Sequence, residues 1–197
     1  FQNILEVISA KEDELGKLDA VAGDGDHGIG MVRGLKAAHK TVQDANTMSP
    51  SQLISDAGAS FSDAAGGSSG ALVGILMITT GNKLQDDNMD TAHVAQALEL
   101  GLTRMCKLGK SGPGQKTMID TLDPFITSLK TFANKSLSDG WQAALPAAED
   151  GMNATATMTS QKGRAAKLGE RSKGHKDPGA VSMIYMLETV GEELKSA

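Results

Sequence analysis

Several features are scarce in this 197-residue sequence. Aromatic residues make up only 3% of the chain, so the core must rely on Ala, Leu, Ile, Val and Met, which suit close packing of helices. Cys106 is the only cysteine, which excludes an internal disulfide. The longest apolar run, residues 71–78, is far shorter than the ~20 residues that span a bilayer. No secretory signal is visible. These absences predict a cytoplasmic protein without a membrane segment.

Basic charge is also in short supply. The formal net charge is -5, and nucleic-acid partners need a basic face, so nucleic-acid binding is not expected. The composition, with 40% hydrophobic and 22% charged residues, is ordinary for a globular protein. No internal repeat and no break in composition divides the chain. We therefore expect a single domain over residues 1–197.

Runs of alternating β-branched residues are missing as well, whereas apolar residues recur at helical spacing throughout the chain. Two helix starts carry clear signals, because Ser49-Pro50 and Asp177-Pro178 each place an N-capping side chain before a first-turn proline. The sequence predicts an all-α fold of about eight antiparallel amphipathic helices in an up-and-down bundle or barrel. The helical patterns lie near residues 1–8, 31–42, 53–64, 72–84, 94–105, 118–132, 141–152 and 181–194.

Four connections are richer in glycine and polar residues than a simple link requires: residues 19–30, 66–70, 109–117 and 163–179. They follow the first, third, fifth and seventh predicted helices. In an up-and-down bundle, alternate connections fall at the same end. We therefore expect these four segments to converge on one rim and to form a shared site there.

The first of these connections brings three aspartates together, Asp19, Asp24 and Asp26. A dinucleotide-binding turn is excluded because no strand precedes it, and an EF-hand is excluded because Ile29 and Leu35 stand at its glycine and glutamate positions. Mg²⁺ prefers carboxylates, water and substrate phosphates. The pattern favours a magnesium site for a phosphorylated ligand, with two metals bridged by an aspartate. Aspartates that only form turns in a solvated loop are the alternative.

The other three connections offer groups that suit phosphate. Ser68 and Ser69 supply hydroxyls beside a helix start. For Lys110 and Lys116, a phosphate contact and a plain solvated loop are equally compatible with the sequence. The segment after residue 163 is basic, which favours a nearby anion, with solubilising surface charge as the alternative. Arg164 or Arg171 is the candidate to offset charge during phosphoryl transfer.

Four stretches, LDAVAGDGDHGIGM, GGSSGALVG, GQKTMIDTLDPF and GRAAKLGERSKGHKDPGAVS, together resemble the DhaL family. Members of this family are the nucleotide-binding subunits of bacterial dihydroxyacetone kinases. The resemblance implies an eight-helix antiparallel barrel that binds ADP or ATP at one rim. It implies two Mg²⁺ on Asp19, Asp24 and Asp26, which act in catalysis with Arg164. The nucleotide-binding residues that it implies are His27, Gly28, Ile29, Gly30, Ser68, Ser69, Gly109, Met118, Arg164, Arg171, Asp177, Pro178 and Gly179.

The resemblance also implies partners. In the family, the sugar is bound covalently to a histidine of a separate DhaK subunit, and DhaM, a phosphotransferase-system protein, recharges ADP to ATP. The alternatives are an ATP-dependent kinase domain for dihydroxyacetone, erythrulose or a related short ketose, and a nucleotide-bound coregulator that binds a transcriptional regulator. A homodimer is left open.

Overall fold

The computed structural model describes residues 1–45, 48–84 and 89–196. Within these ranges the chain is helical and contains no strand, as predicted. The described helices comprise nine α-helices and two 3₁₀-helices: α1 (Gln2–Ala10), α2 (Glu12–Ala20), α3 (His27–Asp44), α4 (Pro50–Ala65), α5 (Gly67–Lys83), α6 (Thr91–Gly109), α7 (Ile119–Thr131), α8 (Leu137–Ala154), η1 (Thr155–Thr157), η2 (Arg164–Ser172) and α9 (Pro178–Ser196).

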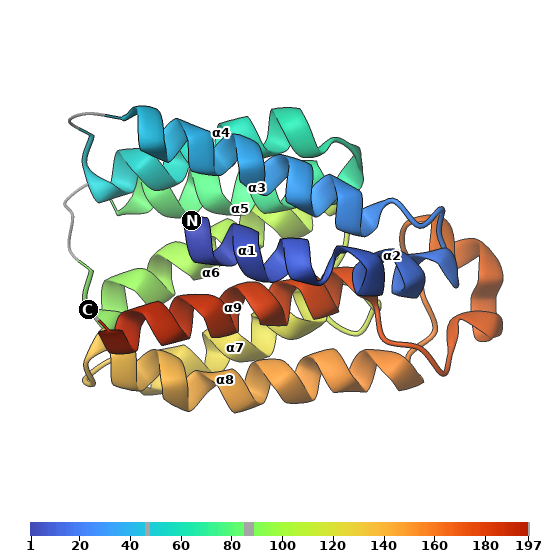
Figure 1. The fold of residues 1–197 in the computed structure, drawn as a ribbon. Helices are drawn as coiled ribbons and strands as arrows, with labels where there is room; N and C mark the ends of the chain where they lie inside the picture. The colour runs from blue at the N-terminus through green and yellow to red at the C-terminus, as the bar shows by residue number, and fades with distance from the viewer. Residues whose placement is uncertain (46–47, 85–88, 197) are drawn as a thin grey trace.

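The helices form a closed antiparallel ring (Figure 1). Helices that follow one another along the chain pack side by side from α3 to α9. The last helix then packs against α1 and α2, which closes the ring. In consequence, the first and last segments of the chain lie next to each other (Figure 1).

The core is made mainly of aliphatic side chains, as the scarcity of aromatics predicts. Three of the few aromatic rings are buried in it, those of Phe61, Phe125 and Trp141. The rings of Phe125 and Trp141 meet edge to face, with centroids 4.8 Å apart. The indole N–H of Trp141 donates to the carbonyl of Leu187 at 2.8 Å, which ties α8 to α9.

Both predicted N-caps are present. Ser49 Oγ accepts from the N–H of Gln52 at 3.3 Å, and the Asp177 carboxylate accepts from the N–H of Ala180 at 2.8 Å. Pro50 and Pro178 are the first residues of α4 and α9. No helix in the described ranges is both long and apolar enough to cross a membrane.

The structure differs from the sequence prediction at several element boundaries: α3 already begins at His27, and the predicted connection 163–179 contains η2. Two further differences concern α2 and α5. The helical conformation is interrupted at Lys11, and α2 is therefore a separate helix. The apolar pattern did not indicate α2, because Leu15 is its only buried residue. Residues 67–70 were expected in a connection but form the first turn of α5, and Gly66 alone separates α4 from α5. Gly66 makes this sharp change of direction with a φ of 70°.

Candidate active site

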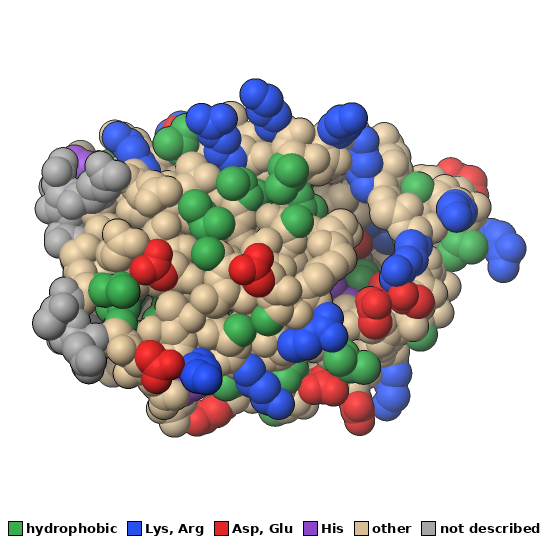
Figure 2. Space-filling model, turned by 90° about the horizontal axis from the view of Figure 1, so that it is seen from above, with side chains coloured by type: hydrophobic (Ala, Val, Ile, Leu, Met, Phe, Trp, Pro, Cys, Tyr) green, Lys and Arg blue, Asp and Glu red, His purple; other side chains and the backbone are tan. Residues whose placement is uncertain are grey.

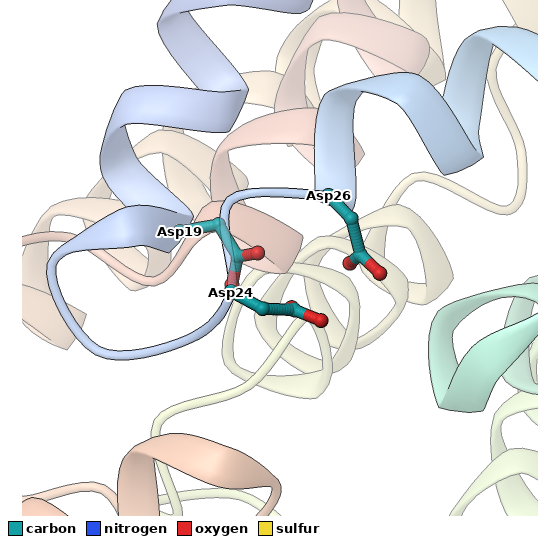
Figure 3. A group of neighbouring side chains, drawn as sticks. All are labelled: Asp19, Asp24 and Asp26. Carbon is teal, nitrogen blue, oxygen red and sulfur yellow. The ribbon is translucent and has the colours of Figure 1, made fainter.

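The three predicted aspartates meet at one point, although they come from three different local structures (Figure 3). Asp19 lies in the last turn of α2, Asp24 in the following turn, and Asp26 directly before α3. One carboxylate oxygen from each lies within 4.8 Å of the others. Asp24 and Asp26 are exposed, and Asp19 is half-buried. Hard oxygen donors at this spacing fit Mg²⁺, which takes a few carboxylates and completes its shell with water and phosphate.

Arg164 brings positive charge to this acidic cluster from the other half of the chain. Its guanidinium forms an ion pair with Asp24, and its Nη1 lies 3.7 Å from Oδ1 of Asp26. Desolvation, followed by the charge of Asp24, raises the pKa of Asp26, and Arg164 opposes this shift. The cluster thus holds more negative charge than its own residues neutralise, which favours a bound cation.

His27 is buried directly behind the cluster and connects three helices. Its Nε2 lies 2.9 Å from Ser182 Oγ on α9, and its Nδ1 lies 3.3 Å from Ser69 Oγ on α5. Ser182 Oγ donates to the carbonyl of Gly179 at 3.0 Å, so it accepts from Nε2–H. Ser69 then donates to Nδ1. Burial lowers the pKa of His27 and disfavours its charged form, and the charge of Asp19 opposes this shift.

Several predicted residues lie at the starts of helices that border the cluster. The N–H of His27 donates to the Asp19 carboxylate at 3.3 Å. Gly28 is buried, Ile29 is 55% exposed, and Gly30 is half-exposed, all in the first turn of α3. Ser68 and Ser69 lie in the first turn of α5. Free N–H groups at such helix starts attract phosphate.

The remaining predicted residues belong to the connections before α7 and α9. Gly109 is the last residue of α6. Met118 is buried, and its side chain borders Gly179. Asp177 caps α9, which begins at Pro178. Arg171 is exposed, and no hydrogen bond or ion pair in the described part of the chain joins it to the aspartates, so Arg164 and not Arg171 contacts the cluster.

The four predicted rim segments therefore meet at one end of the bundle. His27 in the first segment is hydrogen-bonded to Ser69 in the second. Arg164 in the last segment forms an ion pair with Asp24 in the first. The ammonium of Lys116 donates to the carbonyl of Ser172 at 2.7 Å, which joins the third segment to the last. Seen from above, acidic and basic side chains adjoin at this end of the molecule (Figure 2). Carboxylates, an arginine and helix starts in this arrangement are chemically suited to a metal-bound polyphosphate.

The chain matches the DAK2 domain family over residues 21–192. It is a DAK2 domain. Among its relatives, the L-erythrulose 1-kinase of Mycolicibacterium smegmatis is 38% identical over 98% of this chain. The ADP-binding subunit DhaL of the PEP-dependent dihydroxyacetone kinase of Escherichia coli is 32% identical over 93% of this chain. The chain covers 34% of the first relative and 89% of the second.

A solved structure shares the fold of this DAK2 domain. It is the dihydroxyacetone kinase of C. freundii in complex with AMP-PNP and Mg²⁺, with a TM-score of 0.78 and 28% identity. The similarity covers 97% of this chain and 32% of that one. The DAK2 domain thus spans about a third of the length of that kinase and of the erythrulose kinase.

The structure of the DAK2 domain also reveals residues that sequence reasoning missed. Ser182, the partner of His27, lies in the apolar pattern of the last helix, where nothing distinguishes it. Asp120 is buried and accepts from the N–H groups of Gly114 and Thr117 at 2.5 and 2.7 Å, which shapes the connection before α7. Lys116 is 5% exposed and bonds to backbone carbonyls, so its ammonium is not available to a phosphate.

Proposed function

We propose that this DAK2 domain is the ADP- and ATP-binding subunit of a dihydroxyacetone kinase. Asp19, Asp24 and Asp26 would hold two Mg²⁺ through their carboxylates. Bound Mg²⁺ supplies positive charge that offsets the charge of the nucleotide phosphates. The first turns of α3, α5 and α9 orient those phosphates through their N–H groups, and Arg164 neutralises charge on the transferred group.

One observation carries this proposal: three carboxylates from residues 19–26 and an arginine from the distant position 164 meet where several helices begin. Phosphoryl transfer depends mainly on positioning and on charge stabilisation, which such a constellation provides. The names of the relatives support the same chemistry, because they include ADP-binding subunits and a kinase solved with AMP-PNP and Mg²⁺.

We further propose that the sugar is presented by a separate DhaK-type subunit and that a DhaM-type protein recharges the bound ADP. Relatives named as DhaL subunits support this proposal, since two of them are 34% and 32% identical to this chain over 94% and 93% of its residues. Three DhaL relatives, two from Listeria innocua and one from Escherichia coli, are described as parts of PEP-dependent kinases. An open acidic site at one end of a bundle suits transfer to a sugar that a partner holds.

Substitution of the cluster tests the proposal. Asp24→Asn and Asp26→Asn should each lower phosphoryl transfer to dihydroxyacetone by at least about 100-fold, because each removes a charged metal ligand. The exposed Asp63 on α4 provides the matched control, and Asp63→Asn should retain wild-type turnover. Circular dichroism should show unchanged helicity in all three variants. Full activity of both cluster variants would overturn the assignment.

A second candidate is an ATP-dependent kinase domain for erythrulose or a related short ketose. Three relatives named as erythrulose kinases, at 36–38% identity, favour it. Gel filtration distinguishes the two. Nucleotide that stays bound and is phosphorylated only by a DhaM-type donor supports the first candidate. Rapid exchange with free ATP, with turnover of erythrulose, supports the second.

A further inference from the structure

Lys116 is an unusual residue, because its charged side chain is buried at 5% exposure without an ion pair among the described residues. Its ammonium donates instead to three backbone carbonyls, those of His175 at 2.6 Å, Ser172 at 2.7 Å and Met158 at 3.4 Å. An ammonium has three protons, so these bonds use its whole donor capacity. A buried lysine is tolerated only when it is paired in this way.

The three carbonyls belong to the base of one long segment. We call residues 159–174 the Arg loop, because they carry Arg164. Met158 directly precedes this loop, and Ser172 and His175 lie at its returning end. Lys116 therefore holds both ends of the Arg loop at a single point. Since Lys116 lies in the connection between α6 and α7, it also ties that base to the bundle.

Other hydrogen bonds within the base hold its outgoing and returning segments together. The N–H of Gly174 donates to the carbonyl of Ala156, and the N–H of Ser160 donates to Ser172 Oγ, both at 2.8 Å. These bonds close the loop on itself and tie its returning end to η1, but they do not reach the α6–α7 connection. Lys116 supplies the buried side-chain contact with the α6–α7 connection. Two more exposed bonds join the same segments: the N–H of Gln161 donates to the carbonyl of Gln115 at 3.2 Å, and the ammonium of Lys162 donates to the carbonyl of Lys110.

Arg164 depends on this anchoring for its position. Its side chain is 65% exposed, and its ion-pair partners are Asp24 and Asp26 at the far side of the site. An exposed arginine on a loop has many rotamers, and a displacement of about 1 Å in a charge-stabilising group costs up to about 100-fold in rate. The location of the loop base therefore sets where the guanidinium lies relative to the aspartates.

We propose that Lys116 is a positioning residue for phosphoryl transfer: by fixing the base of the Arg loop to the bundle, it holds Arg164 against Asp24 and Asp26. The catalytic consequence rests on the proposed function. The anchoring itself rests on the contacts of Lys116 alone and is tested without nucleotide or activity.

Limited trypsin digestion tests the anchoring. In Lys116→Met, cleavage after Arg164, Lys167 and Arg171 should become at least about 10-fold faster, while cleavage in α3 stays slow. Lys107→Met, at an exposed lysine in the last turn of α6, is the matched control and should resemble the wild type. If Lys116→Met does not fold, Lys116→Gln keeps two donors and should give an intermediate rate. Loop cleavage equal to that of the control would overturn the proposal.

Kinetics test whether Lys116 acts through Arg164. Lys116→Met should lower kcat by about 10–100-fold with a KM for nucleotide within about threefold of the wild type. Arg164→Met should lower kcat further, and the double variant should be no worse than Arg164→Met alone, because one residue acts through the other.

In Lys116→Ala, added propylammonium should restore part of kcat, because it can donate to the carbonyls of Met158, Ser172 and His175 in place of the missing ammonium. Multiplicative losses in the double variant, or no response to the amine, would contradict the proposal. A wild-type protein without kinase activity would remove the proposed function, and the trypsin comparison would still decide the anchoring.

Discussion

At the scale of single residues, His27 shows how a buried polar group organises the site. Both ring nitrogens are within hydrogen-bond distance of serines from other helices, at 2.9 Å for Ser182 and 3.3 Å for Ser69. The ring therefore connects the start of α3 to α5 and α9. Its sequence position beside Asp26 indicated a role in the site, and Ser69 was also a predicted site residue. No local pattern could show that Ser69 and Ser182, which lie 42 and 155 residues away along the chain, are its partners.

Replacement of His27 measures the strength of this connection. His27→Phe should lower the free energy of unfolding by about 1–3 kcal/mol, because buried hydroxyls lose their partner. Urea denaturation checks this value. The matched control is His39→Phe on the same helix, at a half-buried histidine, which should change stability by less than about 1 kcal/mol. An equal loss of unfolding free energy in the two variants would show that the serine contacts do not stabilise the fold.

Asp177 gives the molecule a pH dependence with a defined sign. Burial raises the pKa of its carboxyl to about 7, against the N–H groups of Ala180 and Gly179, which lower it. In the unfolded chain the same group has a pKa near 3.8. Between pH 3.8 and about 7, the folded state therefore keeps a proton on Asp177 that the unfolded chain has lost. The stability from this group is complete below about pH 4 and is lost as pH rises through about 7.

Asp177→Asn isolates this effect, because an amide oxygen can still cap α9 but takes up no proton. Between pH 5 and pH 8 the wild type should lose about 1–3 kcal/mol more stability than the variant. Urea titrations at several pH values measure the difference. Parallel pH profiles for the two proteins would contradict the raised pKa.

At the scale of elements, the close contact between α2 and α3 places the aspartates. Gly28 lies so near α2 that a Cβ there would be 2.2 Å from the carbonyl oxygen of Glu12, a backbone atom that cannot move away alone. Gly28→Ala should therefore separate the two helices and destabilise the protein by about 1–3 kcal/mol. It should also weaken Mg²⁺–nucleotide binding, since Asp19 and Asp26 lie on the two elements that move apart.

Gly30 is the matched control for this change. It lies in the same first turn, and its Cβ would be 3.4 Å from the nearest atom, the carbonyl oxygen of Ala65. Gly30→Ala should leave stability unchanged or raise it by up to about 1 kcal/mol, because alanine favours a helix. Thermal unfolding measured by circular dichroism compares the two variants. A Gly28→Ala protein as stable as Gly30→Ala would refute the close contact.

Sequence patterns predict elements with a strong apolar stripe or an end signal, and they miss weaker ones. The Asp177-Pro178 start of α9 was predicted because capping and first-turn proline are local effects. The short helix α2 was missed because Leu15 alone is buried. Lys116 was left undecided between phosphate and solvent, since its partners lie 42 to 59 residues further along the chain.

At the scale of the whole molecule, ring closure packs the first and last helices of the chain together, so that the end of α2 and the start of α9 lie side by side at the site. The last helix packs against α1 and α2, and this contact places Ser182 beside His27 and the α9 start near the aspartates (Figure 1). The alternation of up and down helices was predictable from the helix count, and the convergence of the four rim segments followed from it. The closing contact depends on packing along the whole bundle, which local patterns do not encode.

The central claim is that this convergence creates a site for Mg²⁺ and a polyphosphate. Anomalous diffraction from crystals grown with Mn²⁺ and ADP tests it most directly, because Mn²⁺ can replace Mg²⁺ at oxygen ligands and is located by its own signal. The account predicts two anomalous peaks, each at about 2.0–2.3 Å from oxygens of Asp19, Asp24 or Asp26, with the ADP phosphates beside them. ADP bound elsewhere, or no peak at these carboxylates, would contradict it.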